Sequence, residues 1–206
     1  YQKAYDTIMS HKFRPWEGAE GRISGQYKIA LVQLAKQAIM QKEYERALEL
    51  LKKSLEYPLN LGEGRLEGTK DNNIHYYLGN VYTALGDNDM ADKEYSLATL
   101  GVDEPAGAMY YYDQPADMIM YKGIAYRALG DEQSACRCFN KLMDYGERHL
   151  YDDVKNDFFA VSLPDFMVFE DDINIRNKAH CYYLMGLADL GFGEKEKAKE
   201  AFEKAL

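Results

Sequence analysis

Apolar side chains recur every three or four residues in four stretches of the chain, and a short polar turn divides each stretch in two. The segment "HYYLGNVYTALGDNDMADKEYSLATLG" is the clearest example, with a glycine and an aspartate at its turn. One apolar position per helical turn predicts an amphipathic helix, so each stretch predicts a helical hairpin. The sequence therefore predicts an all-α fold. The four hairpins are expected at about residues 26–58, 72–104, 116–146 and 174–206.

Small residues recur at equivalent places in these hairpins. Gly79, Gly123 and Gly186 lie inside the first helix, where glycine costs about 1 kcal/mol relative to alanine. We expect glycine there because a neighbouring helix packs too closely for a Cβ atom. Gly86 and Gly130 are each followed by aspartate, which predicts a glycine that ends the first helix and an acid that caps the second.

The recurring positions resemble the tetratricopeptide repeat, whose pattern is L-G-x2-Y followed by A-x3-F within about 34 residues. In the second hairpin Leu78-Gly79 and Tyr82 match the first part, and Ala91 and Tyr95 match the second. The resemblance implies a right-handed α-α superhelix of helical hairpins. It also implies a concave face that binds peptides or proteins.

The hairpins are spaced more widely than standard repeats. The matching alanine of the second helix lies at positions 47, 91, 135 and 198, giving intervals of 44, 44 and 63 residues, against about 34 for the motif. Each junction therefore holds an insertion, and such insertions map to loops on one face of a repeat protein. We expect a single helical-repeat domain over residues 1–206, with an extra helix in the insertion at about 147–173.

Several aromatic and acidic residues lie in the insertions, outside the repeat pattern. Flat aromatic faces with neighbouring carboxylates suit a polar, ring-shaped or peptide ligand. The run Tyr110–Tyr112 also has a structural interpretation, in which the rings fill an oversized junction, and both interpretations stay open. The ligand-binding candidates are Trp16, Glu17, Glu20, Tyr111, Tyr112 and Asp113.

The tetratricopeptide resemblance also implies which first-helix side chains face the groove. One subgroup of that family holds a C-terminal carboxylate with lysines, arginines and asparagines. At the matching positions here, we take only Lys36 and Asn80 to resemble the clamp residues, which argues against this clamp function. The groove candidates are Asn73, Tyr76, Asn80, Met120 and Tyr183, accompanied by Val32, Lys36, Ile124 and His180.

Charge and motifs exclude several classes of function. The net charge of −9 and the pI near 5.0 argue against nucleic acid and against an anionic membrane surface. The sequence has no apolar run of the roughly 18 residues that a membrane span needs. The glycine-rich pieces "GAEGRISG" and "GEGRLEG" lack the Gly-Lys-Ser/Thr ending of a phosphate loop and predict turns. We expect no cofactor.

Neither a metal site nor a catalytic site stands out. The acids 170–172 precede a predicted helix, where carboxylates stabilise the N-terminus, so capping explains them without a metal. His180 adjoins Cys181, but neighbours in a helix do not face one another. We therefore expect no catalytic residues and a protein that is not an enzyme.

A second resemblance covers nearly the whole chain. The pieces "FRPWEGAEGRISGQY", "NLGEGRLEG", "AMYYYDQPADM" and "FAVSLPDFMVFEDD" are similar to the C-terminal repeat region of large bacterial proteins with an uncharacterised β-rich, mutarotase-like domain upstream. Arg14 and Ala19 stand where that family has histidine and glycine. The resemblance implies a fragment of a longer bacterial protein, in the cytoplasm or the periplasm.

We therefore expect a non-catalytic scaffold that binds a protein, a peptide or its own upstream domain. The alternative is a carbohydrate-active or carbohydrate-binding protein, in which the insertion aromatics and carboxylates line a shared pocket. A terminal repeat without a cap exposes its apolar face, which favours homodimers joined through that repeat.

Overall fold

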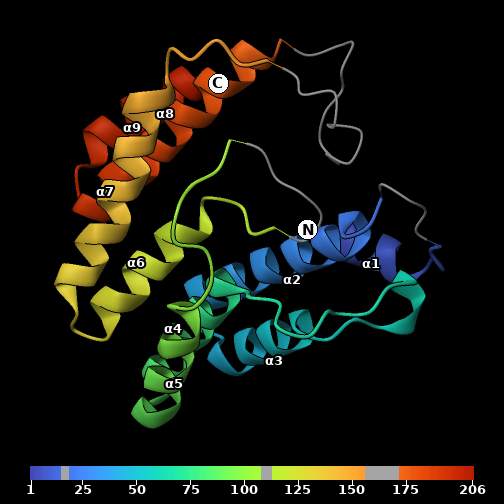
Figure 1. Ribbon diagram of the computed structural model, residues 1–206. Helices are drawn as coiled ribbons and strands as arrows, with labels where there is room; N and C mark the ends of the chain where they lie inside the picture. The colour runs from blue at the N-terminus through green and yellow to red at the C-terminus, as the bar shows by residue number, and fades with distance from the viewer. Residues whose placement is uncertain (15–18, 108–112, 156–171) are drawn as a thin grey trace. The chain divides into compact units, whose positions relative to one another are not determined.

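All regular elements of the described chain are helices. The computed structural model describes residues 1–14, 19–107, 113–155 and 172–206, and within these ranges it contains nine α-helices, one 3-10 helix and no strand (Figure 1). The predicted all-α class is confirmed. The helices are α1 (Gln2–Met9), α2 (Arg22–Met40), α3 (Tyr44–Ser54), η1 (Leu59–Leu61), α4 (Asn72–Leu85), α5 (Asn88–Ala98), α6 (Met118–Ala128), α7 (Glu132–His149), α8 (Ile173–Phe192) and α9 (Lys195–Ala205).

Four hairpins, α2–α3, α4–α5, α6–α7 and α8–α9, share one turn geometry. In each, the residue after the first helix or one position later has a left-handed backbone, and the next N–H bonds to the carbonyl five residues back. This bond satisfies a carbonyl that the helix end leaves free. The four bonds join Glu43 N to Ala38 O (2.9 Å), Asp87 N to Tyr82 O (3.0 Å), Asp131 N to Tyr126 O (2.9 Å) and Glu194 N to Asp189 O (2.8 Å).

Glycine holds the left-handed position in three of the four turns. Gly86, Gly130 and Gly193 have φ angles of 82°, 83° and 84°. The following acid behaves as predicted in the middle hairpins, where Asp131 Oδ1 accepts from Ser134 N at 2.9 Å and Asp87 Oδ1 accepts from Met90 N at 3.2 Å.

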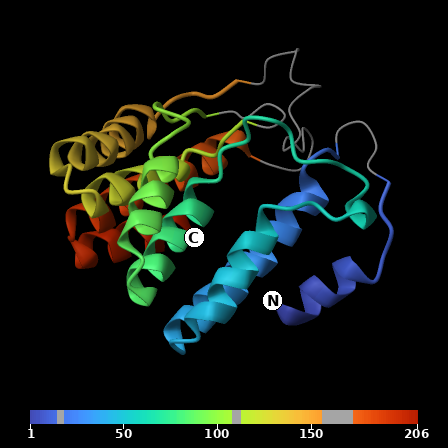
Figure 2. The same ribbon diagram turned by 90° about the horizontal axis from the view of Figure 1, so that it is seen from below.

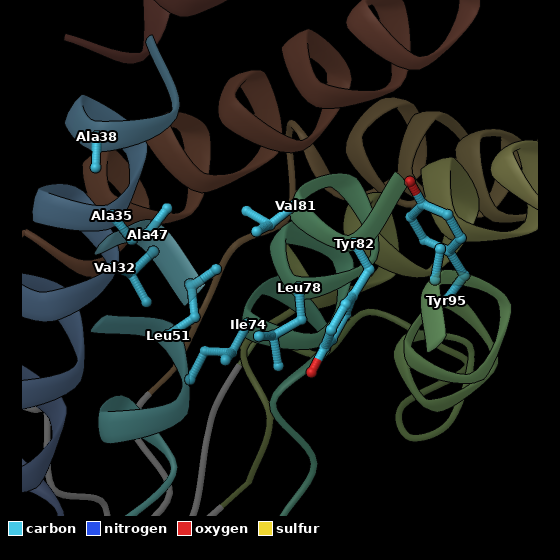
Figure 3. Packing of buried hydrophobic residues seen from close by; sticks show 11 residues of the cluster. Val32, Ala35, Ala38, Ala47, Leu51, Ile74, Leu78, Val81, Tyr82 and Tyr95 are labelled. Carbon is cyan, nitrogen blue, oxygen red and sulfur yellow. The ribbon is translucent and has the colours of Figure 1, made fainter. Parts of the chain in front are cut away.

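The N-terminal unit, Tyr1–Ala98, contains α1 to α5. Figures 1 and 2 show α2 and α3 of this unit running side by side as an antiparallel pair. Figure 3 shows Val32 of α2, Leu51 of α3 and Leu78 of α4 meeting in one apolar core, with Tyr95 of α5 at its edge. A second cluster, which includes Ile8, joins α1 to α2 and η1.

The C-terminal unit, Thr99–Leu206, contains α6 to α9. Phe139 of α7 fills its centre, because its ring lies against Gly123 of its own hairpin and against Gly191 of the next. Arg127 donates to the Gly191 carbonyl at 2.7 Å and pairs with Glu132, so it also links the two hairpins. The single domain expected from the sequence stays a prediction.

An aromatic ring of the second helix occupies the space beside each first-helix glycine. A Cβ added to Gly186 would lie 2.6 Å from Cε1 of Phe202, and the rings of Tyr95 and Phe139 lie equally close to Gly79 and Gly123. The expected close approach of the two helices is therefore present in three hairpins. The aromatic ring of the second helix therefore occupies the space that a Cβ would need.

Two parts of the chain outside the four hairpins differ from the prediction or are not described. The apolar pattern did not predict α1, which is only eight residues long. Residues 156–171, which would hold most of the extra helix expected at about 147–173, lie outside the described residues. On either side of them, α7 continues to His149 and α8 begins at Ile173.

The glycine–ring contact predicts opposite effects for two Gly→Ala substitutions within helices. Gly79→Ala should lower the free energy of unfolding by about 2 kcal/mol, since a Cβ would overpack the buried Tyr95 ring. Gly25→Ala, in α2, should raise it by about 0.5–1 kcal/mol, because nothing lies within 4 Å of the added methyl and alanine is the better helix former. Urea denaturation measures both, and equal effects would contradict the contact.

The first hairpin carries a non-glycine residue at its left-handed turn position. Lys42 has a φ of 62°, which costs an L-residue about 1 kcal/mol. Lys42→Gly should therefore raise the free energy of unfolding by about 0.5–1 kcal/mol. Gly86→Ala, the reverse change at the matching turn, should lower it by a similar amount in the same denaturation experiment.

Candidate functional site

The first helices of the C-terminal unit carry an acid paired with a tyrosine. Asp117 occupies the N-cap position of α6, and the Tyr183 hydroxyl of α8 lies close enough to its carboxylate for the two groups to affect each other's pKa. Burial raises the pKa of Tyr183 to about 12, and the nearby Asp117 carboxylate adds to that shift. Burial also raises the pKa of Asp117, against the opposing effect of its hydrogen bonds. Two residues far apart in the sequence thus form one polar pair.

Tyr76 and Tyr183, both groove candidates, have the same surroundings in different hairpins. The Tyr76 ring lies 6.0 Å from the Tyr95 ring at 46°, and the Tyr183 ring lies 6.0 Å from the Phe202 ring at 47°. Each first-helix tyrosine is therefore supported by the core ring of its own second helix. Tyr183 is nevertheless 38% exposed, so a supported aromatic face is available on the surface.

The other groove candidates of the N-terminal unit are partly engaged by the protein itself. Asn80 Oδ1 accepts from the Tyr95 hydroxyl at 2.8 Å, and Asn73 Oδ1 accepts from Ile74 N at 2.9 Å. Lys36 Nζ lies 5.6 Å above the Tyr77 ring. These contacts fix the side chains in position, which favours a pre-organised surface over a flexible one.

His180 and Met120 complete the surface around Asp117 and Tyr183. Met120 is partly buried and packs against the core of the unit. His180 lies three residues before Tyr183 on α8, so both side chains point to one side of the helix. Burial lowers the pKa of His180, although a backbone hydrogen bond with Ala106 opposes this, and its buried Nε2 has no hydrogen-bond partner among the described residues. The burial favours the neutral imidazole.

We call the set Asp117, Met120, His180 and Tyr183 the first-helix face of the C-terminal unit. Asp117 was absent from the groove candidates proposed from the sequence. The signal was available, since Asp117 lies at the same repeat position as Asn73 and His180, six residues before Gly123. The sequence did not single it out, because Asp117 precedes the regular part of α6.

The insertion candidates are placed only in part. Trp16, Glu17, Tyr111 and Tyr112, with Tyr110, lie outside the described residues. Glu20 is partly exposed just before α2, in the N-terminal unit, and Asp113 is exposed before α6, in the C-terminal unit. The proposed shared pocket of these residues stays a prediction.

The glycine-rich insertion between α3 and α4 holds α1 and α2 in place through its side chains, and we call this insertion the clasp. Glu63 caps α2, because its carboxylate accepts from Gly21 N at 2.9 Å and from Ser24 N at 3.1 Å. Asn60 donates to the carbonyls of Ile8 and His11 and so holds the end of α1. The turn interpretation of the glycines is confirmed by left-handed φ angles at Gly21, Gly62 and Gly68.

Asp71 closes the same clasp at the start of α4. It is 4% exposed, and its carboxylate binds Lys28 Nζ at 2.9 Å and Arg65 Nη2 at 2.9 Å. Burial alone would raise the pKa of Asp71, but the two basic side chains outweigh it and hold that pKa below its usual range. The insertion is therefore tied to α2 and α4 by buried charge.

The described ranges contain no group of three or more histidine, cysteine or acidic side chains that could hold a metal ion. Asp172 accepts from Asn174 N at 2.9 Å and caps α8, as the capping interpretation predicts. No helix within these ranges is both long and apolar enough to cross a membrane.

Two stretches of the sequence match known family models. Residues 117–145 and residues 179–206 each match a model described as tetratricopeptide repeat, and the first of these begins at Asp117. These two stretches, which lie in the α6–α7 and α8–α9 hairpins, therefore resemble tetratricopeptide repeats. The shared turn geometry and the glycine–ring contacts of the hairpins agree with this resemblance. Such repeats are in general non-catalytic modules for protein interaction.

Two solved structures also resemble the chain. "Crystal structure of MamA" is 17% identical, with 98% of this chain and 83% of that chain covered and a TM-score of 0.29. "Crystal structure of MamA protein" is 16% identical, with 100% and 92% covered and a TM-score of 0.30. TM-scores of this size carry no argument about arrangement or function, so the repeat assignment rests on the two family matches and the hairpin geometry.

The clasp predicts a pH-dependent loss of stability. Asp71→Asn should lower the free energy of unfolding by about 2 kcal/mol at pH 7, because Lys28 and Arg65 lose their partner while staying partly exposed. Since the folded pKa of Asp71 is depressed, its stabilisation is complete above the unfolded pKa of about 4 and is lost as the pH falls through the folded value. Denaturation at several pH values should therefore show the difference between variant and wild type shrinking below about pH 4.

Proposed function

We propose that this chain is a non-catalytic scaffold that binds an extended peptide segment of a protein partner along its first helices. The main support is the repeated tyrosine at Tyr76 and Tyr183, each held against a core ring at the same distance and nearly the same angle. An aromatic side chain fixed by the core offers a large contact area at little entropic cost.

The polar groups around these tyrosines suit a peptide. An extended peptide exposes backbone N–H and C=O groups along its length, and its side chains occupy successive pockets. Asn73 and Asn80 supply amide groups on α4, and Asp117 supplies a carboxylate beside Tyr183. Recognition of this kind needs fixed donors and acceptors around an apolar platform, which both units provide separately.

The source of the segment is part of the proposal. It would be a domain upstream in the same chain, which the sequence resemblance implies, or a second protein. The alternative function is carbohydrate binding at the insertion aromatics. That function requires Trp16, Glu17, Glu20, Tyr111, Tyr112 and Asp113 to line one pocket.

The test compares two Tyr→Ala variants against a peptide array and a glycan array. Tyr183→Ala removes the supported ring and should weaken binding of the selected peptides about tenfold, a typical loss for an interface aromatic. Tyr151→Ala is the matched control, since Tyr151 is 82% exposed beyond α7 and should leave binding unchanged. Fluorescence polarisation measures the affinities, and circular dichroism checks that both variants stay folded.

Two outcomes would contradict the proposal, and they can be told apart. Glycans bound without peptides would replace the proposed function by the carbohydrate alternative. Peptide binding that survives Tyr183→Ala but is lost in Trp16→Ala would move the site to the insertions.

A further inference from the structure

The two units differ sharply in charge. Thr99–Leu206 contains 20 acidic and 12 basic residues, a net charge of −8, whereas Tyr1–Ala98 contains 14 acidic and 13 basic residues, a net charge of −1. Nearly all of the excess negative charge of the chain therefore belongs to the C-terminal unit. Such a field attracts cationic ligands and raises their rate of association.

Asp117 differs from other carboxylates that the structure holds in place. Asp71 binds Lys28 and Arg65, and Asp103 binds Lys122. For Asp117, no ion pair with a basic side chain is present among the described residues, and its partners are the Tyr183 hydroxyl and backbone N–H groups. Among the described residues this half-buried carboxylate is therefore compensated by neutral hydrogen bonds and by the positive end of the α6 dipole, and by no basic side chain.

None of the described basic side chains is paired with the Asp117 carboxylate. The neutral His180 ring brings no positive charge to this face. Lys122, on the same helix as Met120, is committed to Asp103. The exposed part of the Tyr183 ring adds an electron-rich surface, and aromatic faces attract ammonium and guanidinium groups.

We propose that Asp117 and Tyr183 form a pocket for a lysine or arginine side chain of the bound peptide. The carboxylate accepts hydrogen bonds from the cationic head group, and the aliphatic stem lies along the Tyr183 ring and Met120. The partner is thus a segment with a basic residue at this position, carried by a basic stretch that suits the charge of the C-terminal unit. This inference rests on the proposed peptide-binding function and adds the chemistry of its ligand.

Four peptide pools test the proposal with the full chain. Each pool contains nonapeptides with an acetylated N-terminus and an amidated C-terminus. The flanking positions hold the same equal mixture of residues in every pool, and the central residue is fixed as lysine, arginine, glutamine or glutamate. At about 150 mM salt, where distant charges are screened, the lysine and arginine pools should bind about tenfold more tightly than the glutamine pool, as a charge-assisted hydrogen bond allows. The glutamate pool should bind most weakly.

Asp117→Asn should bring the lysine and arginine pools to within about twofold of the glutamine pool, because the amide keeps the shape and loses the charge. Asp144→Asn is the matched control. Asp144 is an exposed acid of α7 that pairs with Arg148 of the same helix at 3.8 Å, so this variant changes the net charge equally and should keep the preference.

A second measurement needs no substitution. Addition of the lysine pool to the wild-type chain should shift the amide resonances of Asp117 and Met118, and the glutamine pool should shift them less. Binding of no pool would overturn the proposed peptide function. Binding without a basic preference, a preference that survives Asp117→Asn, or shifts confined to other residues would overturn the basic pocket alone.

Discussion

The contact between a first-helix glycine and a second-helix ring is the constraint on which the hairpins depend. In three hairpins the ring occupies the space that a Cβ would need, so the two helices approach closely at this contact. This approach brings the chain from one helix into the next within a turn of a few residues, and the same carbonyl–amide bond closes all four turns. The position of Tyr183 on the surface follows from it, because its supporting ring, Phe202, is the ring that faces Gly186.

The hairpins were predictable from the sequence because their signals are local and repeated. Gly79 and Tyr95 lie 16 positions apart, as do Gly123 and Phe139 and also Gly186 and Phe202. A constraint that recurs at fixed spacing is visible without any structure. The left-handed turn was equally local, although the first hairpin places Lys42 where glycine is expected.

The clasp and the acid–tyrosine pair were not predictable in this way. Glu63 caps a helix 42 residues earlier, and Asp117 meets Tyr183 across two helices and an insertion. Neither pair repeats, and each depends on how the chain returns on itself. The sequence identified the glycine-rich pieces as turns, but it did not show that a carboxylate between those glycines holds the start of α2. In the site, Tyr183 was found by its repeat position, while Asp117 was overlooked.

Phe139 gives the C-terminal unit a mechanical property. Its ring lies between Gly123 of its own hairpin and Gly191 of α8, and Arg127 of α6 donates to the Gly191 carbonyl. A pulling force on α6 is therefore transmitted to α8 through these side-chain contacts as well as through the connecting chain. Under tension the four helices of this unit should yield together, so a partner that holds the first helices meets a surface that keeps its form until the whole unit opens.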